Sequence, residues 1–179
     1  RTQSGLTFAN GLRSILRQDP DVVMVGEIRD KDTATIAVNT ALTGHLLLST
    51  LHTNSTSATL PRLMDMGIDP YLVASTVELI IGQRLVRKLC NKCKTECKPT
   101  DSEEKYLKSI SFNNNMQKIT IWHGVGCNEC SGTGYKGRVS INEVMVVSGD
   151  LRDGILRREH ASVLEKIARA QGMKTLMED

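Results

Sequence analysis

The sequence has few aromatic residues, no long apolar run and no block of like charges. Aromatic residues make up 3% of its 179 residues, and 23 basic residues barely exceed 20 acidic ones. Because binding of nucleic acid needs stacking platforms or a basic track, we expect no nucleic acid partner. The longest apolar stretch, near Leu79-Ile80-Ile81, is bounded by Glu78 and Gln83 and falls short of the roughly 18 residues of a membrane span. We therefore expect no segment that crosses a bilayer.

The chain also lacks an initiator Met and the apolar core of a secretion signal. It begins Arg1-Thr2-Gln3-Ser4-Gly5, which favours a fragment of a longer protein. With 40% apolar and 24% charged residues, its composition is typical of one soluble domain with a small appendage. Five cysteines are too few for a disulfide scaffold, and their spacing suits a metal in a reducing compartment. We expect a cytoplasmic protein.

Hydrophobic periodicity predicts an α/β core in the first part of the chain. The expected elements are a helix over 7–17 capped by Thr7 and ended by Asp19-Pro20, a strand over Val22–Val25, a helix over 30–42 closed by Gly44, and a strand over Leu46–Leu48. The strand-helix-strand order predicts a parallel pair joined by a right-handed crossover. The unbroken apolar run of the first strand predicts burial on both of its faces.

Further elements follow the same rules. We expect a helix over Leu60–Met66, closed by Gly67 and with Pro61 in its first turn. A second helix is expected from its cap Asp69 up to Gly82, with a buried stripe of Val73, Val77, Ile80 and Ile81. The remaining elements are a strand over 83–89 rather than a helix end, a strand over Arg138–Val147, and helices over 150–158 and 161–171. The last helix turns Leu164, Ile167 and Ala168 inward. The predicted division is a core over 1–89, a cysteine-bearing insertion over 90–135, and a returning strand with helices over 136–179.

A carboxylate follows the first predicted strand. Glu27 stands directly after Gly26 and two residues before Arg29. Ligands of open α/β sheets gather at the carboxyl ends of strands, where a carboxylate can hold Mg²⁺ through water or orient an attacking water for phosphoryl transfer. The usual Walker-B acid would occupy the position of Gly26, so the match is atypical. The alternative is that residues 27–30 merely begin a solvated helix.

Two histidines flank the second predicted strand. His52 follows it in a hydroxyl-rich segment and would stand beside Glu27 if the two strands are neighbours. A histidine at that edge can donate a hydrogen bond to a terminal phosphate and respond to its loss on hydrolysis. His45 precedes the strand, and from its position alone a structural role is the preferred interpretation.

Four cysteines form two C-x-x-C pairs, Cys90 with Cys93 and Cys127 with Cys130. Four thiolates so arranged are typical of a tetrahedral, structural Zn²⁺ site. The intervening 33 residues (94 through 126) exceed the usual spacing and must loop out. Unrelated reduced thiols are the alternative, and the fifth thiol, Cys97, is interpreted as a bystander with a substitute-ligand role left open.

The glycine cluster that follows the second pair is not a phosphate loop. No G-x-x-x-x-G-K-[ST] pattern occurs in the 179 residues. The glycines of residues 131–138 are expected instead to let the second knuckle turn tightly around the metal and return to the sheet.

Several motifs together closely resemble the secretion ATPases of type II secretion and type IV pilus assembly. These motifs are Leu6-Thr7-Phe8-Ala9, Leu16-Arg17-Gln18-Asp19-Pro20-Asp21, Gly26-Glu27-Ile28-Arg29-Asp30, Thr43-Gly44-His45-Leu46, Ser49-Thr50-Leu51-His52-Thr53-Asn54, Gln83-Arg84-Leu85-Val86 and Gln171-Gly172-Met173-Lys174-Thr175-Leu176. In that family the two C-x-x-C pairs mark the secretion and pilus-extension type, whereas retraction motors lack them.

The resemblance implies the C-terminal part of a RecA-like P-loop ATPase domain, with ATP, Mg²⁺ and Zn²⁺ as cofactors. It also implies a homo-hexamer at the cytoplasmic face of the inner membrane, docked to a polytopic platform protein. Glu27 matches the acid of the family's atypical Walker-B box, and His45 and His52 match its histidine box; Arg29 matches the pattern and is grouped with the nucleotide-binding residues. The family's phosphate loop and aspartate box precede these residues, so we expect the isolated chain to be inactive and the full-length protein to hydrolyse ATP.

A binding module without ATPase activity is the alternative function. The run Cys127-Asn128-Glu129-Cys130-Ser131-Gly132-Thr133-Gly134 has the C-x-x-C-x-G-x-G form of zinc-binding cochaperones, and a zinc ribbon is a related case. Cochaperones carry several such repeats, whereas this chain has one. The α/β stretch before Cys90 would serve no purpose in a zinc module and favours the motor. The zinc lobe is then expected to present a docking surface to a membrane partner.

Overall fold

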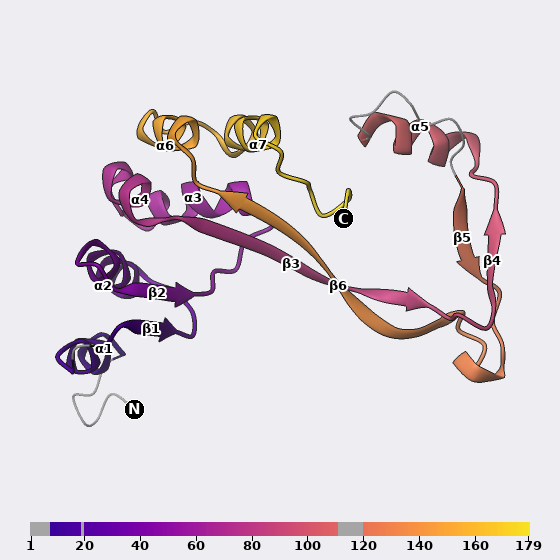
Figure 1. The fold of residues 1–179 in the computed structure, drawn as a ribbon, viewed down its shortest axis with the longest axis horizontal. Coiled ribbons are helices and arrows are strands. Elements are labelled where there is room, and N and C mark those ends of the chain that lie inside the picture. Colours follow the sequence, from indigo (N-terminus) through magenta and orange to yellow (C-terminus); the bar gives the residue numbers. More distant parts are fainter. Residues whose placement is uncertain (1–7, 19, 111–119) are drawn as a thin grey trace. The chain divides into compact units, whose positions relative to one another are not determined.

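The chain folds into two compact units. The structure is a computed structural model that describes residues 8–18, 20–110 and 120–179 (Figure 1). The first unit comprises Arg1–Ile81 and Val144–Met173, and the second comprises Gly82–Glu143 and Lys174–Asp179. The expected cap Thr7 and the expected helix stop at Asp19 lie outside the described residues. Each unit is described separately below.

The first unit is built on a parallel strand pair. Strand β1 (Val22–Val25) pairs with β2 (Leu46–Ser49) in parallel, with Val22 opposite Leu46. Helix α1 (Phe8–Leu16) precedes the pair and α2 (Lys31–Leu42) connects its strands (Figure 1). Asp30 caps α2 by accepting a 2.8 Å hydrogen bond from the Thr33 N–H. The predicted strand-helix-strand order and parallel pairing are confirmed.

Only one face of β1 is covered. Val23 and Val25 are buried, whereas Val22 is 53% and Met24 76% exposed. The prediction that β1 is buried on both faces is therefore wrong. Side chains alternate between the two faces of a strand, and in the described part of the chain no element covers the row that contains Met24. Leu46 and Leu48 of β2 are similarly exposed.

Helix α3 begins earlier than its apolar spacing predicts. It runs from Thr56 to Asp65, because Ser55 caps it by accepting a hydrogen bond from the Ala58 N–H. Pro61 consequently lies inside the helix and not in its first turn, which corrects the predicted start at Leu60. The helix closes as predicted near Gly67, whose φ of 89° is in the left-handed region favoured by glycine.

Helix α4 is shorter than predicted. It runs from Pro70 to Thr76 with Asp69 as its cap, and the chain then becomes strand β3 (Leu79–Leu89), so the predicted helix up to Gly82 is wrong. Three of the misassigned residues, Val77, Ile80 and Ile81, are β-branched and prefer an extended backbone. Strand β3 pairs with β6 (Tyr135–Val146), and the strand predicted over 83–89 is confirmed within it.

Two C-terminal helices complete the core of the first unit. Helices α6 (Gly149–Leu156) and α7 (Ala161–Ala170) bury Leu151, Ile155 and Leu164 completely. The predicted inward side of the last helix is confirmed, since Leu164 and Ala168 are buried and Ile167 is partly buried against the core. Arg152 of α6 donates to the Ala74 carbonyl and, at 2.8 Å, to the Glu78 carboxylate. This pair of contacts ties α6 to the C-terminal part of α4 and to the segment that follows it.

The second unit carries the cysteines. Strands β4 (Lys94–Cys97) and β5 (Ile121–Gly124) pair antiparallel, with Cys97 opposite Ile121. Helix α5 (Asp101–Ile110) lies between them in sequence, and a short 3₁₀ turn covers Asn128–Cys130. Among the described residues of the whole chain, no helix has the length and apolarity needed to span a bilayer.

Candidate functional site

The carboxyl ends of β1 and β2 bring Glu27, Arg29 and His52 together. Glu27 Oε2 lies 2.7 Å from Arg29 Nε and 3.3 Å from His52 Nε2. The parallel register places both strand exits at one edge, so the predicted proximity of Glu27 and His52 is confirmed. The three side chains form one contiguous polar cluster.

Thr50 holds the β1 exit against the β2 exit. Its hydroxyl donates a 2.7 Å hydrogen bond to the Gly26 carbonyl, and its own carbonyl accepts one from the Ile28 N–H at 3.0 Å. These bonds flank Glu27 on both sides and fix its backbone. Thr50 has no predicted role from the sequence, where only its place in a hydroxyl-rich segment hints at one. Its neighbour Ser49 has a buried hydroxyl without a hydrogen-bond partner in the described structure.

The electrostatics of this cluster keep Glu27 ionised. The hydrogen bond from Arg29 lowers the pKa of Glu27 below its ordinary value, more than partial desolvation raises it, and His52 adds to the lowering. Arg29 and His52 are 73% and 86% exposed, against 34% for Glu27. The carboxylate is therefore an acceptor for water or for a hydrated metal ion, not a proton donor, and its two partners can turn toward a ligand.

His45 lies at the other end of β2. Its Nδ1 is 3.1 Å from the Thr43 hydroxyl and 3.2 Å from the Thr40 carbonyl, which places it against the C-terminal end of α2. The structure thus does not bring His45 into the Glu27 cluster. A contact between His45 and a nucleotide stays a prediction.

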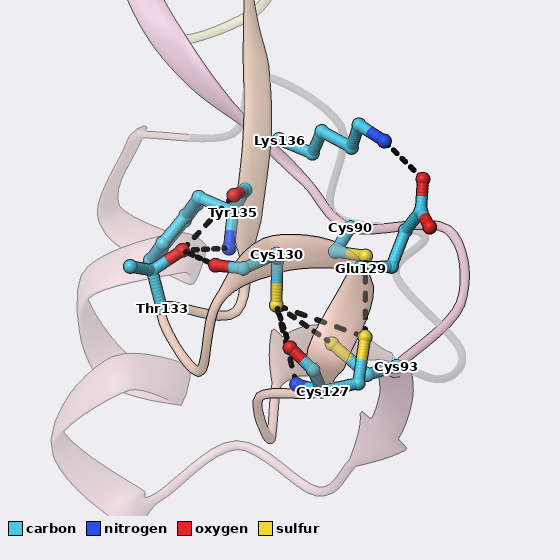
Figure 2. Close-up of polar contacts among 8 residues, drawn as sticks. All are labelled: Cys90, Cys93, Cys127, Glu129, Cys130, Thr133, Tyr135 and Lys136. Atoms are coloured by element: carbon cyan, nitrogen blue, oxygen red, sulfur yellow. Dashed lines mark hydrogen bonds and ion pairs between the residues drawn. The ribbon is translucent and has the colours of Figure 1, made fainter.

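The four predicted metal ligands converge in the second unit, and all their sulfur atoms lie within 4.8 Å of one another. Figure 2 shows the sulfurs pointing toward a common centre. Sγ–Sγ distances are 3.9 Å for Cys90–Cys127, 3.8 Å for Cys93–Cys130 and 3.8 Å for Cys127–Cys130. A tetrahedral site with Zn–S bonds of about 2.3 Å has edges of about 3.8 Å. The thiols therefore fit a tetrathiolate Zn²⁺ site.

Backbone N–H groups favour a thiolate in this cluster. The Cys127 N–H donates to Cys130 Sγ at 3.2 Å (Figure 2). The Gly134 N–H donates to the same sulfur, also at 3.2 Å. Burial raises the pKa of Cys130, but these bonds and those from the neighbouring thiols together lower it to about 6. Burial, with the hydrogen bonds among the thiols, raises the pKa of Cys93 to about 12. These hydrogen bonds therefore favour the thiolate form of Cys130, which is the form in which a cysteine binds a metal ion.

Glycines allow the second knuckle to close. Gly126, Gly132 and Gly134 have φ values of 92°, 77° and 75°, in the region where L side chains are strained. A Cβ on Gly134 would also meet the Gly124 carbonyl oxygen at 2.5 Å, so two backbone segments touch directly there. The tight turn predicted for the glycines of residues 131–138 is found at Gly132 and Gly134, whereas Gly126 precedes the predicted segment. Cys97 lies outside the cluster, where its thiol donates to the Ile121 carbonyl at 3.5 Å.

Comparison with known proteins gives a consistent result. The profile of the family described as Type II/IV secretion system protein matches residues 1–179. The chain is 46% identical over 178 residues to a type IV pilus assembly ATPase, PilB, of Thermus thermophilus, covering 99% of this chain and 20% of that protein. It is 45% identical over 168 residues to type II secretion system protein E of Aeromonas hydrophila, covering 94% of this chain and 33% of that protein. The chain therefore spans between a fifth and a third of these relatives.

Solved structures agree with this assignment. The pilus retraction motor PilT with bound ADP matches with a TM-score of 0.60 and 25% identity, over 96% of this chain and 42% of that one. The ATPase DotB of Legionella pneumophila matches with a TM-score of 0.57 and 26% identity, over 95% and 36%. The predicted α/β fold, the C-terminal part of a RecA-like ATPase domain, is confirmed. The chain belongs to the Type II/IV secretion system protein family.

Proposed function

We propose that the protein to which this chain belongs is a hexameric ATPase that drives type II secretion or type IV pilus assembly. It would act at the cytoplasmic face of the inner membrane, with a polytopic platform protein as partner. The observation that carries this proposal is the 3.3 Å contact between Glu27 and His52 at the carboxyl edge of a parallel strand pair. Relatives named as a type IV pilus assembly ATPase and as a type II secretion system protein support it. The alternative, a zinc module without ATPase activity, is not retained, since the family match includes the whole α/β core.

Each residue of the cluster has a distinct proposed role. Glu27, kept ionised by Arg29, accepts hydrogen bonds from the attacking water or from water on Mg²⁺. His52 contacts Glu27 and would donate to the terminal phosphate of a bound nucleotide. Arg29 and His45 are proposed to contact the nucleotide, Arg29 from beside Glu27 and His45 from the far end of β2.

Replacing the carboxylate in the full-length protein tests this assignment. Glu27→Gln should lower ATP turnover at least about a hundredfold, as expected for loss of a water-orienting group, while leaving nucleotide binding intact. Asp32→Asn is the matched control, because Asp32 lies in the first turn of α2 outside the cluster. Turnover by Glu27→Gln equal to that of Asp32→Asn would refute the role of Glu27.

The isolated 179 residues are proposed not to hydrolyse ATP at a useful rate. The sequence has no G-x-x-x-x-G-K-[ST] loop to cradle the phosphates, so most nucleotide affinity should be missing. A turnover assay with Mg²⁺ and ATP is the test. Robust hydrolysis by these residues alone would overturn this part of the proposal and leave the role of Glu27 open to the mutant test above.

The cysteine cluster is proposed to hold a structural Zn²⁺ ion. A closed tetrathiolate site leaves no position open for substrate, so it would contribute folding energy rather than chemistry. Cobalt substitution should give the absorption spectrum of a tetrahedral thiolate site at one equivalent. Cys90→Ser should lose that spectrum, whereas the control Cys97→Ser should keep it because Cys97 lies outside the cluster. A spectrum unaffected by Cys90→Ser would exclude this site.

The zinc lobe, residues 90–135, is proposed to present the docking surface for the membrane platform. Support comes from the large apolar side chains of Trp122 and Val125, which are 50% and 63% exposed in this part of the chain. Replacing Cys90 and Cys127 by serine should then weaken platform binding in a pull-down with full-length protein. Unchanged binding after loss of zinc would contradict this role.

A further inference from the structure

The first unit contains an open pocket of about 620 Å³ beside the Glu27 cluster. Its walls come from α3, from the segment after β2 and from the turn between α6 and α7 with the first residue of α7. Arg62 and Arg158 line it with His160, and His52 belongs to both the pocket and the Glu27 cluster. The volume suits a ligand of several residues rather than a single small ion.

The pocket has two guanidinium groups without a carboxylate partner. Among the described residues neither Arg62 nor Arg158 makes an ion pair, although the acidic residues Asp65 and Glu159 line the same pocket. Glu159 instead forms an ion pair with Arg157, which does not line the pocket; its Oε1 lies 3.3 Å from Arg157 Nε. Arginine presents a planar fork of donors that matches a carboxylate, so two unpaired arginines over one pocket favour an acidic ligand.

Arg158 occupies an unusual backbone position. Its φ is 55°, and its N–H donates to the Ile155 carbonyl at the end of α6. Helices that end in this way most often place glycine there, because the left-handed region strains residues with a Cβ. The turn itself therefore does not require an arginine. Glycine at this position would preserve the turn and remove only the side chain, which makes a clean test available.

The other residues that line the pocket restrict which class of ligand can bind there. Asp65 is exposed to the pocket and would repel a multiply charged oxyanion, but it can accept hydrogen bonds from backbone N–H groups. Pro61, Met64 and Ala58 add apolar surface on the α3 side. Donors for carboxylates, an acceptor for amides and an apolar wall together match a peptide better than free phosphate.

We propose that this pocket binds an acidic peptide segment of a partner protein, with its carboxylates on Arg62 and Arg158 and its backbone N–H groups facing Asp65. The proposal goes beyond the ATPase function and does not depend on nucleotide turnover. A segment bound there would lie beside His52, so an occupied pocket would adjoin the cluster that contains Glu27.

Fluorescence anisotropy on the 179-residue chain tests the proposal without nucleotide. The probe is a short labelled peptide with two glutamates separated by a leucine, and its partner is the same peptide with glutamines. The acidic peptide should bind, and the glutamine peptide should not. Arg158→Gly and Arg62→Gln should each weaken binding about tenfold, the value of a lost charge-assisted hydrogen bond. Lys166→Gln, an exposed charge on α7 outside the pocket, is the matched control and should bind normally.

Competition with inorganic phosphate tests whether the pocket binds peptide carboxylates or free phosphate. At ionic strength matched with chloride, phosphate should fail to displace the peptide. Displacement by phosphate, equal binding of the glutamine peptide, or unchanged affinity in both arginine variants would each overturn the proposal. An unchanged thermal midpoint of Arg158→Gly would show that its loss of binding is not loss of folding. Because no arm measures hydrolysis, these outcomes are independent of the test of Glu27.

Discussion

Arg29 controls the charge of Glu27 at the edge of the strand pair. The 2.7 Å contact between them is the largest cause of the lowered pKa of Glu27. A carboxyl group whose pKa is lowered on folding favours the folded state at pH values above its ordinary pKa. That contribution is lost as the pH falls through the lowered folded pKa. The pKa of Glu27 therefore depends on its contact with Arg29.

Arg29→Ala is expected to raise the pKa of Glu27 toward its ordinary value. The reason is loss of both the hydrogen bond and the nearby positive charge. Titration of the Glu27 side-chain carbon by NMR measures the shift. Arg157→Ala removes a guanidinium that pairs with Glu159 instead and should leave the Glu27 curve in place. A Glu27 titration identical in both variants would mean that Arg29 does not set this charge.

The sequence identifies part of this cluster. Glu27 and His52 each follow an apolar run, and that placement is enough to predict that parallel strands bring them together. Thr50 escapes prediction because its bonds to Gly26 and Ile28 depend on the strand register, which the sequence pattern does not specify. His45 shows the converse limit, since membership of a sequence motif does not place it near Glu27.

Close backbone packing between Gly124 and Gly134 shapes the zinc knuckle at the scale of an element. Gly134→Ala should destabilise the zinc-loaded chain by more than about 3 kcal/mol, because the new methyl group meets the Gly124 backbone and its φ is strained. Gly137→Ala shares the positive φ but meets no atom within 4 Å, so it should cost only about 1–2 kcal/mol. Urea unfolding measures both. Equal losses of unfolding free energy in the two variants would show that backbone strain alone, without the close contact, explains the glycine at position 134.

Helix boundaries show where sequence patterns fail. The apolar spacing of Val73, Val77 and Ile80 fits a helix, yet the chain leaves the helix at Thr76 and becomes β3. Periodicity over so few residues does not separate a helix from a strand, and here pairing with β6 decides. Pro61 misleads in another way, because Ser55 starts α3 early enough to place a proline inside it. Tertiary pairing and capping, rather than apolar spacing, set these boundaries.

At the scale of the whole molecule, the two units have separate cores. The buried cysteines form a cluster of their own, distinct from the cluster that contains Val25, Leu60 and Leu164. Among its described residues the second unit thus has little apolar core beside its cysteine cluster, and its order should depend on the metal far more than that of the first unit.

Chelation of zinc is expected to loosen one unit selectively. Hydrogen exchange measured by mass spectrometry should accelerate in 90–97 and 121–135, whereas β1 and β2 should keep their protection. The same chelator saturated with zinc beforehand is the control and should change neither. Equal acceleration in β1 and β2 would mean that the metal supports both units.

The register of β4 and β5 has a practical consequence. The chain leaves β4 at Cys97 and returns at Ile121, and these two residues are paired across the strands. A foreign domain whose own termini lie close together, such as a fluorescent reporter, could replace the stretch between them without separating the metal ligands. The antiparallel pair thus offers a site at which a reporter domain can be inserted to label the protein in living cells.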